Sequence, residues 1–110
     1  MTNNETDPNG LDAHTPGAKL DSGKVRLGLV LGDFRHALVE VGKVGTYGAN
    51  KYTDHGWLSV PNGVERYTDA LYRHLLAEDM DDPDTGLLHA AHCCWNALAR
   101  LELLLKEESE

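Results

Sequence analysis

The stretch GLLHAAHCCWNALARLELLL, residues 86–105, decides the predicted fold because it is almost wholly apolar and long enough for a buried helix. We predict a helix from about residue 87 to residue 106. His89, His92 and Asn96 interrupt its apolar surface at spacings of three and four residues, so they lie on one face. Each buried polar group needs a partner, which a neighbouring side chain, or a cleft holding ligand, metal or water, can supply. We therefore expect this polar stripe to border a cleft, with a polar core satisfied by its neighbours as the alternative.

Two shorter helices are predicted before this one. Apolar residues at helical spacing predict the first over residues 30–43, extending as far as Tyr47, after which glycines and residues 47–57 form an irregular loop. The second follows VPNG, with Asn62 as its N-cap and Glu65 completing a capping-box pattern. It runs to about Glu78.

An acidic turn, EDMDDPDTG, separates the second helix from the third. Pro83 prevents any continuation of the helix, and Asp84 or Thr85 is expected to cap the third one. Because no segment alternates with period two, the sequence predicts an all-α fold.

The chain divides by composition into an arm and a helical domain. Residues 1–22 are rich in Asn, Asp, Thr, Pro and Gly, which predicts a disordered or extended N-terminal arm, and residues 23–110 form the helical domain. A bundle of only three helices cannot bury the long third helix well, because that helix is apolar on two sides. We therefore expect a bundle completed by dimerisation, as a homodimer or a homotetramer.

The charge balance limits the partners of this chain. With 10 basic and 18 acidic residues the formal charge is −8, which argues against binding nucleic acid. A phosphate ligand is compatible with this charge if divalent metal ions lie between it and the carboxylates. The absence of a long apolar run and of a signal-peptide pattern predicts a soluble cytoplasmic protein without membrane contact.

Carboxylates on the second helix are the candidate metal ligands. Glu65 and Asp69 lie four residues apart on one face, and Glu78 ends the helix. Carboxylate oxygens suit Mg²⁺, and also Mn²⁺. Surface pairing of Asp69 with Arg73, and of Glu78 with a histidine, is the alternative reading of these charges.

The loop after the first helix carries candidate substrate-binding residues. Lys51 offers a point charge for phosphate, and Tyr52 or Trp57 offers an aromatic face for a base, with core packing as the alternative for both rings. Lys24 and Arg26, in DSGKVR, are further cations that could reach a bound anion.

Together these stretches resemble a known family. The segments GKVR, YGANKY, HGW and ERYTDALYRHLLAEDMDDPDTGLLHAAHCCWNALARL are similar to the phage and bacterial dATP/dGTP diphosphohydrolases, a MazG-like branch of the all-α nucleoside triphosphate pyrophosphatases. The resemblance runs from about Ser22 to Leu105. The wider MazG-like group uses ExxE and ExxD pairs, whereas the corresponding stretches here read Glu65-x-x-x-Asp69 and His89-x-x-His92. The metal ligands therefore cannot be transferred by motif.

The resemblance implies a helical, oligomeric, Mg²⁺-dependent enzyme that cleaves dGTP or dATP to the monophosphate in a bacterium or a phage-infected host cell. The positions of this chain that match the family are Lys51, Tyr52, Trp57, Asp69, Arg73, His74, His89, His92 and Asn96.

Each candidate residue has an expected role in this reaction. Glu65, Asp69 and Glu78 hold the metal ion. Arg73 and Lys51 stabilise charge on the phosphates; His74, or His89 with His92, orients water or moves a proton; Trp57 or Tyr52 stacks on the purine, and Asn96 reads its edge. A nucleotide-binding module without hydrolysis and a purely structural helical dimer are the two alternatives.

Overall fold

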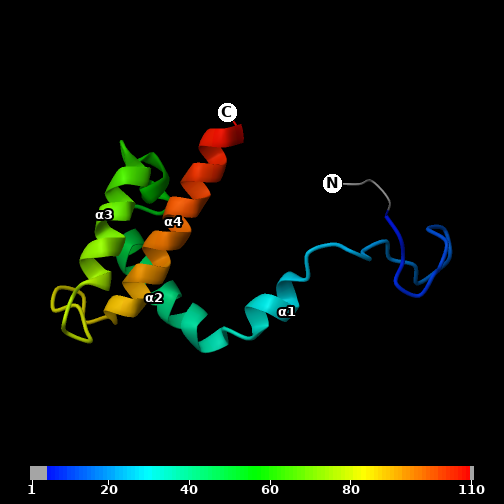
Figure 1. The fold of residues 1–110 in the computed structure, drawn as a ribbon, viewed down its shortest axis with the longest axis horizontal. Helices are drawn as coiled ribbons and strands as arrows, with labels where there is room; N and C mark the ends of the chain where they lie inside the picture. The colour runs from blue at the N-terminus through cyan, green and yellow to red at the C-terminus, as the bar shows by residue number, and fades with distance from the viewer. Residues whose placement is uncertain (1–4, 110) are drawn as a thin grey trace. The chain divides into compact units, whose positions relative to one another are not determined.

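The computed structural model describes residues 5–109, and within them the chain is helical with no strand. Its α-helices are α1 (Leu27–Gly32), α2 (Arg35–Lys51), α3 (Gly63–Leu75) and α4 (His89–Ser109), with a short 3₁₀ helix, η1 (Gly56–Ser59), between α2 and α3 (Figure 1). The all-α prediction is confirmed. None of the helices in this part of the chain has the length and apolarity needed to cross a bilayer.

The chain divides into two units, Met1–Asp33 and Phe34–Glu110. In the first unit, the turns before α1 are organised around the carboxylate of Asp7. One of its oxygens accepts the backbone N–H of Asn9 at 2.7 Å, and the other accepts that of Lys19 at 2.7 Å. Part of the predicted arm, residues 1–4, lies outside the described residues, and the domain boundary near residue 22 stays a prediction.

In the second unit, α4 is the central element and packs against both α3 and α2 (Figure 1). The apolar core is small and consists of Val44 on α2 with Ala91, Ala99 and Leu103 on α4. Glycines allow the close contacts: a Cβ built on Gly63 of α3 would lie 2.7 Å from Cδ1 of Leu103. At this point a large side chain of α4 therefore packs directly against the backbone of a glycine on the neighbouring helix.

The first predicted helix differs from the observed one. Helix α2 continues through the glycines to Lys51, whereas the prediction placed a loop from residue 47. A Cβ at Gly45 would lie 3.1 Å from Nε1 of Trp95, so Gly45 lies where α4 packs against α2. Such packing outweighs the low helix propensity of glycine. At its other end, the predicted segment from residue 30 is interrupted between α1 and α2 at Asp33 and Phe34.

The predicted capping box of α3 is wrong. Asn62 is the N-cap residue, but its backbone is left-handed (φ 56°) and its side chain makes no capping hydrogen bond. A capping side chain normally needs an extended backbone to reach the N–H groups of the first turn. Helix α3 also ends at Leu75, three residues before Glu78.

The predicted cap of the third helix is wrong as well. Helix α4 begins at His89, and the hydroxyl of Thr85 accepts the N–H of Leu87 instead of an N–H in the first turn of α4. The turn is ordered by backbone hydrogen bonds, among them that from His89 N–H to the carbonyl of Met80 at 3.0 Å.

Candidate functional site

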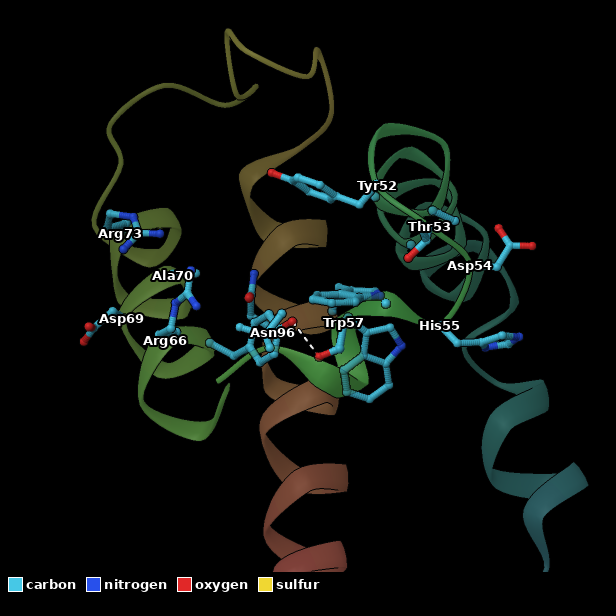
Figure 2. Close-up of a pocket in the computed structure, with 17 residues that line it drawn as sticks. Tyr52, Thr53, Asp54, His55, Trp57, Arg66, Asp69, Ala70, Arg73 and Asn96 are labelled. Carbon is cyan, nitrogen blue, oxygen red and sulfur yellow. Dashed lines mark hydrogen bonds between the residues drawn. The ribbon is translucent and has the colours of Figure 1, made fainter. Parts of the chain in front are cut away.

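A cavity of about 940 Å³ opens between α2, the loop that follows it, α3 and α4. Figure 2 shows Tyr52 and Trp57 of the loop on one side, Arg66, Asp69 and Arg73 of α3 on the other, and Asn96 of α4 between them. Ligand cavities typically have volumes of about 300–1,000 Å³, so this one has room for a nucleotide.

Three aromatic rings form the apolar wall of the cavity. Trp57 and Trp95 meet edge to face with ring centroids 5.6 Å apart, and Tyr67 meets Trp95 in the same way at 5.5 Å. The hydroxyl of Tyr67 donates to the carbonyl of Trp57 at 2.9 Å, and burial raises the pKa of this hydroxyl, so it remains a donor. The loop is thereby attached to α3, and the ring of Trp57 is held in place while lining the cavity.

Tyr52 lies at the rim of the cavity and is open to solvent, with 72% of its surface exposed. Nζ of Lys51 lies 5.3 Å from the centre of its ring, which is within the range of a cation–π contact. An exposed ring beside a cation offers a surface on which a purine can stack.

The polar wall is formed by α3 and α4. Asn96 is buried, and its Nδ2 donates to the carbonyl of His92 at 2.8 Å, so its carbonyl oxygen and its second N–H are the groups it can offer to a ligand. Arg66, Asp69 and Arg73 line the cavity from α3 and are exposed. In Figure 2 the carboxylate of Asp69 lies at the outer side of α3, away from the ring of Trp57.

A cluster of imidazoles lies where α3, the acidic turn and the start of α4 meet. The rings of His74 and His92 are stacked, with centroids 4.2 Å apart and planes within 6°. Nδ1 of His74 lies 2.9 Å from Nδ1 of His89, so one of these nitrogens donates to the other. Nε2 of His92 lies 2.8 Å from the hydroxyl of Thr85 and 3.5 Å from Oδ2 of Asp82.

The charge states of this cluster follow from its burial. Burial lowers the pKa of His74, and the neighbouring imidazole of His92 lowers it further. Burial also lowers the pKa of His92, against the opposing effect of the Asp82 carboxylate. Burial alone raises the pKa of Asp82, but the N–H of Asp84 and the imidazoles outweigh it, so the pKa of Asp82 lies below its ordinary value. The neutral imidazoles of His74 and His92 therefore lie beside the ionised carboxylate of Asp82.

The structure separates the predicted site residues into three sets. Those that line the cavity are Tyr52, Trp57, Asp69, Arg73 and Asn96. Those in the imidazole cluster are His74, His89 and His92. Those outside both are Lys51, Glu65 and Glu78, all exposed, together with Lys24 and Arg26, which belong to the other unit.

The predicted metal ligands do not come together within this chain. Among the described residues, the group of three ligand-type side chains close enough to share an ion is His74, Asp82 and His92, whose ligand atoms lie within 4.8 Å of one another. Glu65, Asp69 and Glu78 form no such group in this part of the molecule, and their role as ligands stays a prediction.

Sequence reasoning missed several residues of both sites, namely Arg66, Tyr67, Asp82, Thr85 and Trp95. A local signal existed for Asp82: an Asp directly before a proline favours an Asx turn, and its Oδ1 accepts the N–H of Asp84 at 3.0 Å. No local signal distinguished Tyr67 and Trp95 from ordinary core residues, because only the packing of η1 against α3 and α4 brings their rings to the cavity.

Comparison with known proteins identifies the family of this chain. Residues 14–110 match the family model described as dATP/dGTP diphosphohydrolase, N-terminal. No curated protein and no solved structure matches the chain.

Proposed function

This chain belongs to the dATP/dGTP diphosphohydrolase family, and from that membership we propose that it binds dGTP or dATP in its cavity and hydrolyses it to the monophosphate. The matched family model describes the N-terminal part of such proteins. What supports the use of this cavity is one observation: a fixed aromatic wall and two arginines line the same space as a buried amide.

The base is assigned to the loop side of the cavity. Tyr52 is exposed there, and Trp57 is held by its contacts with Tyr67 and Trp95, so a purine can enter against a preformed aromatic surface. The carbonyl oxygen of Asn96 accepts hydrogen bonds, and both adenine and guanine carry exocyclic or ring N–H donors. Asn96 therefore favours a purine whose N–H edge faces α4.

The phosphates are assigned to α3. Arg66 and Arg73 lie seven residues apart, two turns along one face of the helix, and both line the cavity. Guanidinium groups bind phosphate oxygens in pairs of hydrogen bonds and stabilise charge that develops on them during hydrolysis. Lys51, at the end of α2, adds a positive charge near the rim.

The chemical step is hydrolysis of the bond between the α and β phosphates. A water oxygen bonds to the α-phosphorus, the bridging oxygen leaves with pyrophosphate, and the proton of the water passes to a base. Asp54 and Asp69 are the carboxylates that line the cavity, and Asp69 lies on the same helix as Arg66 and Arg73, so we assign Asp69 as this base. The clustered imidazoles of His74, His89 and His92 do not line the cavity and receive no part in this step.

Mg²⁺ remains our proposal for the ion that accompanies the triphosphate. It would compensate the repulsion between the phosphates and the carboxylates of this acidic chain. Because Glu65, Asp69 and Glu78 do not converge within one chain, they do not by themselves form a magnesium site, and Asp69 is assigned only the role of base.

A nucleotide panel followed by a turnover assay tests the proposal. We expect dGTP or dATP with Mg²⁺ to raise the melting temperature and to be converted to monophosphate with release of pyrophosphate, and EDTA to stop turnover. Asp69→Asn should abolish turnover without changing the circular dichroism spectrum. Glu102→Gln, an exposed carboxylate change on α4, is the matched control and should leave turnover unchanged.

The same assay separates the alternatives. Tight binding of dGTP or dATP without turnover would make the chain a nucleotide-binding module and would refute the hydrolytic proposal. A melting temperature that no deoxynucleotide changes, with or without Mg²⁺, would leave only a structural role.

A further inference from the structure

We propose that His74, Asp82 and His92 form a binding site for a divalent transition-metal ion, with Zn²⁺ as the reference ion. The site lies at the junction of α3, the acidic turn and α4, outside the nucleotide cavity. It goes beyond the proposed function, because it concerns different residues and a different class of ion from the Mg²⁺ that accompanies a triphosphate.

The separation of Asp82 and His92 is the first argument. Oδ2 of Asp82 lies 3.5 Å from Nε2 of His92, which is longer than the usual 2.7–3.2 Å of an N–H···O hydrogen bond. Zinc ligands lie about 2.0–2.2 Å from the ion, so two ligands at a tetrahedral angle are about 3.4 Å apart. These two atoms are thus spaced as ligands of one ion rather than as a direct hydrogen-bonded pair, and an ion bound there would replace the Thr85 hydroxyl that lies 2.8 Å from Nε2 of His92.

The fixed position of the carboxylate is the second argument. Asp82 is buried, its N–H donates to the carbonyl of Leu87 at 2.8 Å, and its own carbonyl accepts the N–H of Gly86 at 2.7 Å. Its Oδ1 accepts the N–H of Asp84, and its Oδ2 lies 3.4 Å from the Thr85 hydroxyl and 3.5 Å from Nε2 of His92. Because hydrogen bonds fix both the N–H and the carbonyl of Asp82, its carboxylate is already in place, and ion binding costs little conformational entropy at this residue.

The donor set selects the ion. Two imidazole nitrogens and one carboxylate oxygen are ligands typical of zinc and other first-row transition metals, whereas Mg²⁺ prefers oxygen ligands throughout. A site with three protein ligands keeps a coordination position for water or another group. We therefore expect Zn²⁺, Co²⁺ or Mn²⁺ to bind there without nucleotide, and Mg²⁺ to bind far more weakly.

His89 is the positioning residue of this site. Its Nδ1 contact with Nδ1 of His74 fixes the orientation of that ring and leaves the other ring nitrogen for an ion. Hydrogen-bond partners behind a metal ligand commonly change metal affinity by about 10–100-fold when they are removed. Loss of His89 should therefore weaken binding by about this factor, while loss of His74 or His92 should weaken it by more.

Metal binding to the chain alone tests this proposal. The full chain, without an affinity tag and dialysed against EDTA, is titrated with Zn²⁺ by calorimetry and with Co²⁺ by visible absorption, with Mg²⁺ as the comparison. We expect about one equivalent of Zn²⁺ per chain, and cobalt bands of the intensity typical of four- or five-coordinate sites. Because no nucleotide is present, the result does not depend on the proposed hydrolysis.

Variants then assign the ligands. His74→Ala and His92→Gln should abolish the cobalt bands, and His36→Ala, which removes an exposed histidine of α2, should leave them unchanged. Asp82 also orders its turn, so Asp82→Asn is interpreted only if its circular dichroism spectrum matches that of the parent chain. Absence of stoichiometric Zn²⁺ binding to the parent chain, or equal loss with His36→Ala, would overturn the proposal and leave the cluster as a hydrogen-bonded polar core.

Discussion

Asn96 and Asp82 show how a single buried polar side chain can connect local structure to a site. The Nδ2 of Asn96 satisfies the carbonyl of His92 one turn earlier in α4, and the same side chain lines the cavity. Asp82 orders the acidic turn through one carboxylate oxygen and faces His92 with the other. In both residues one polar atom stabilises the fold and a second is available for a ligand.

Asp7 gives a residue-scale prediction about pH. The N–H of Lys19 is the main cause that holds the pKa of this carboxyl below its ordinary value of 3.8, partly offset by burial and helped by the N–H groups of Asn9 and Leu11. A carboxyl whose pKa is lowered by folding stabilises the turns at pH values above its ordinary pKa, and this contribution is lost as the pH falls below that value. We expect the amide chemical shift of Lys19 to titrate with Asp7 in this acidic range.

The matched variants make the assignment specific. Asp7→Asn should shift the Lys19 amide resonance at neutral pH, because an amide side chain has only one accepting oxygen where the carboxylate uses two. Asp12→Asn, an exposed neighbour, should leave it unchanged. A Lys19 resonance that is insensitive both to acid and to Asp7→Asn would contradict the described turns.

At the scale of elements, the two ends of α3 are connected in different ways. Towards its N-terminus, η1 and the preceding loop fix the aromatic wall through the Tyr67 hydroxyl. Beyond its C-terminus, an irregular turn of residues 76–88 brings Asp82 against the first turns of α4, with the isolated bridge between Asp81 and Leu88 closing it. The cavity and the imidazole cluster therefore lie along the same pair of packed helices.

The glycines of α2 give a prediction about this element. Gly42 is exposed, and a Cβ added there meets nothing within 4 Å, whereas one added at Gly45 lies 3.1 Å from Nε1 of Trp95. We expect Gly42→Ala to raise the free energy of unfolding by about 0.5–1 kcal/mol, because alanine has the higher helix propensity. Gly45→Ala should raise the free energy of unfolding by clearly less than this, or lower it. The reason is that the Trp95 ring is held by Trp57 and Tyr67 and cannot easily move away from the added methyl group.

Urea denaturation of both variants at equal chain concentration is the measurement. Equal gains in the two variants would show that α4 does not pack against α2 at Gly45.

At the scale of the whole molecule, the balance between buried and exposed apolar side chains is unusual. None of the large side chains in the described part of the chain is fully buried, and α4 leaves Leu98, Leu101 and Leu105 each more than half exposed. Domains of this size have little core to spare, and association is a common way for them to bury more apolar surface. The sequence already predicted that a second copy of this chain covers these exposed leucines, because α4 is apolar on more sides than α2 and α3 cover.

We therefore propose a homodimer or homotetramer in solution, measured by size-exclusion chromatography with light scattering. The exposed leucines of α4 are the expected contact, so Leu101→Glu should reduce the assembly towards the monomer. Glu102→Gln, an exposed change on the same helix, is the control and should leave the assembly unchanged. Lys106 is not suitable for this purpose, because its side chain has interactions of its own. A parent chain that elutes and scatters as a monomer would refute the proposal.

The sequence by itself determined the helical class, the long central helix and the family, because apolar periodicity and short motifs are local properties. It also placed His89, His92 and Asn96 on one face, since helical spacing alone fixes that relation. The bounds of α2 and the capping of α3 and α4 were predicted less well. These depend on what the ends contact, such as Trp95 at Gly45 and the left-handed backbone of Asn62.

Only the tertiary structure decided how the polar stripe is divided. Asn96 lines the cavity with Trp57 and Arg73, while His92, one turn away, faces Asp82. The physical reason is that residues one turn apart on α4 have different neighbours. Asn96 lies beside the loop that follows α2, whereas His92 lies beside the acidic turn that follows α3. Which neighbours occupy each space depends on how distant segments pack, and no spacing within one helix contains that information.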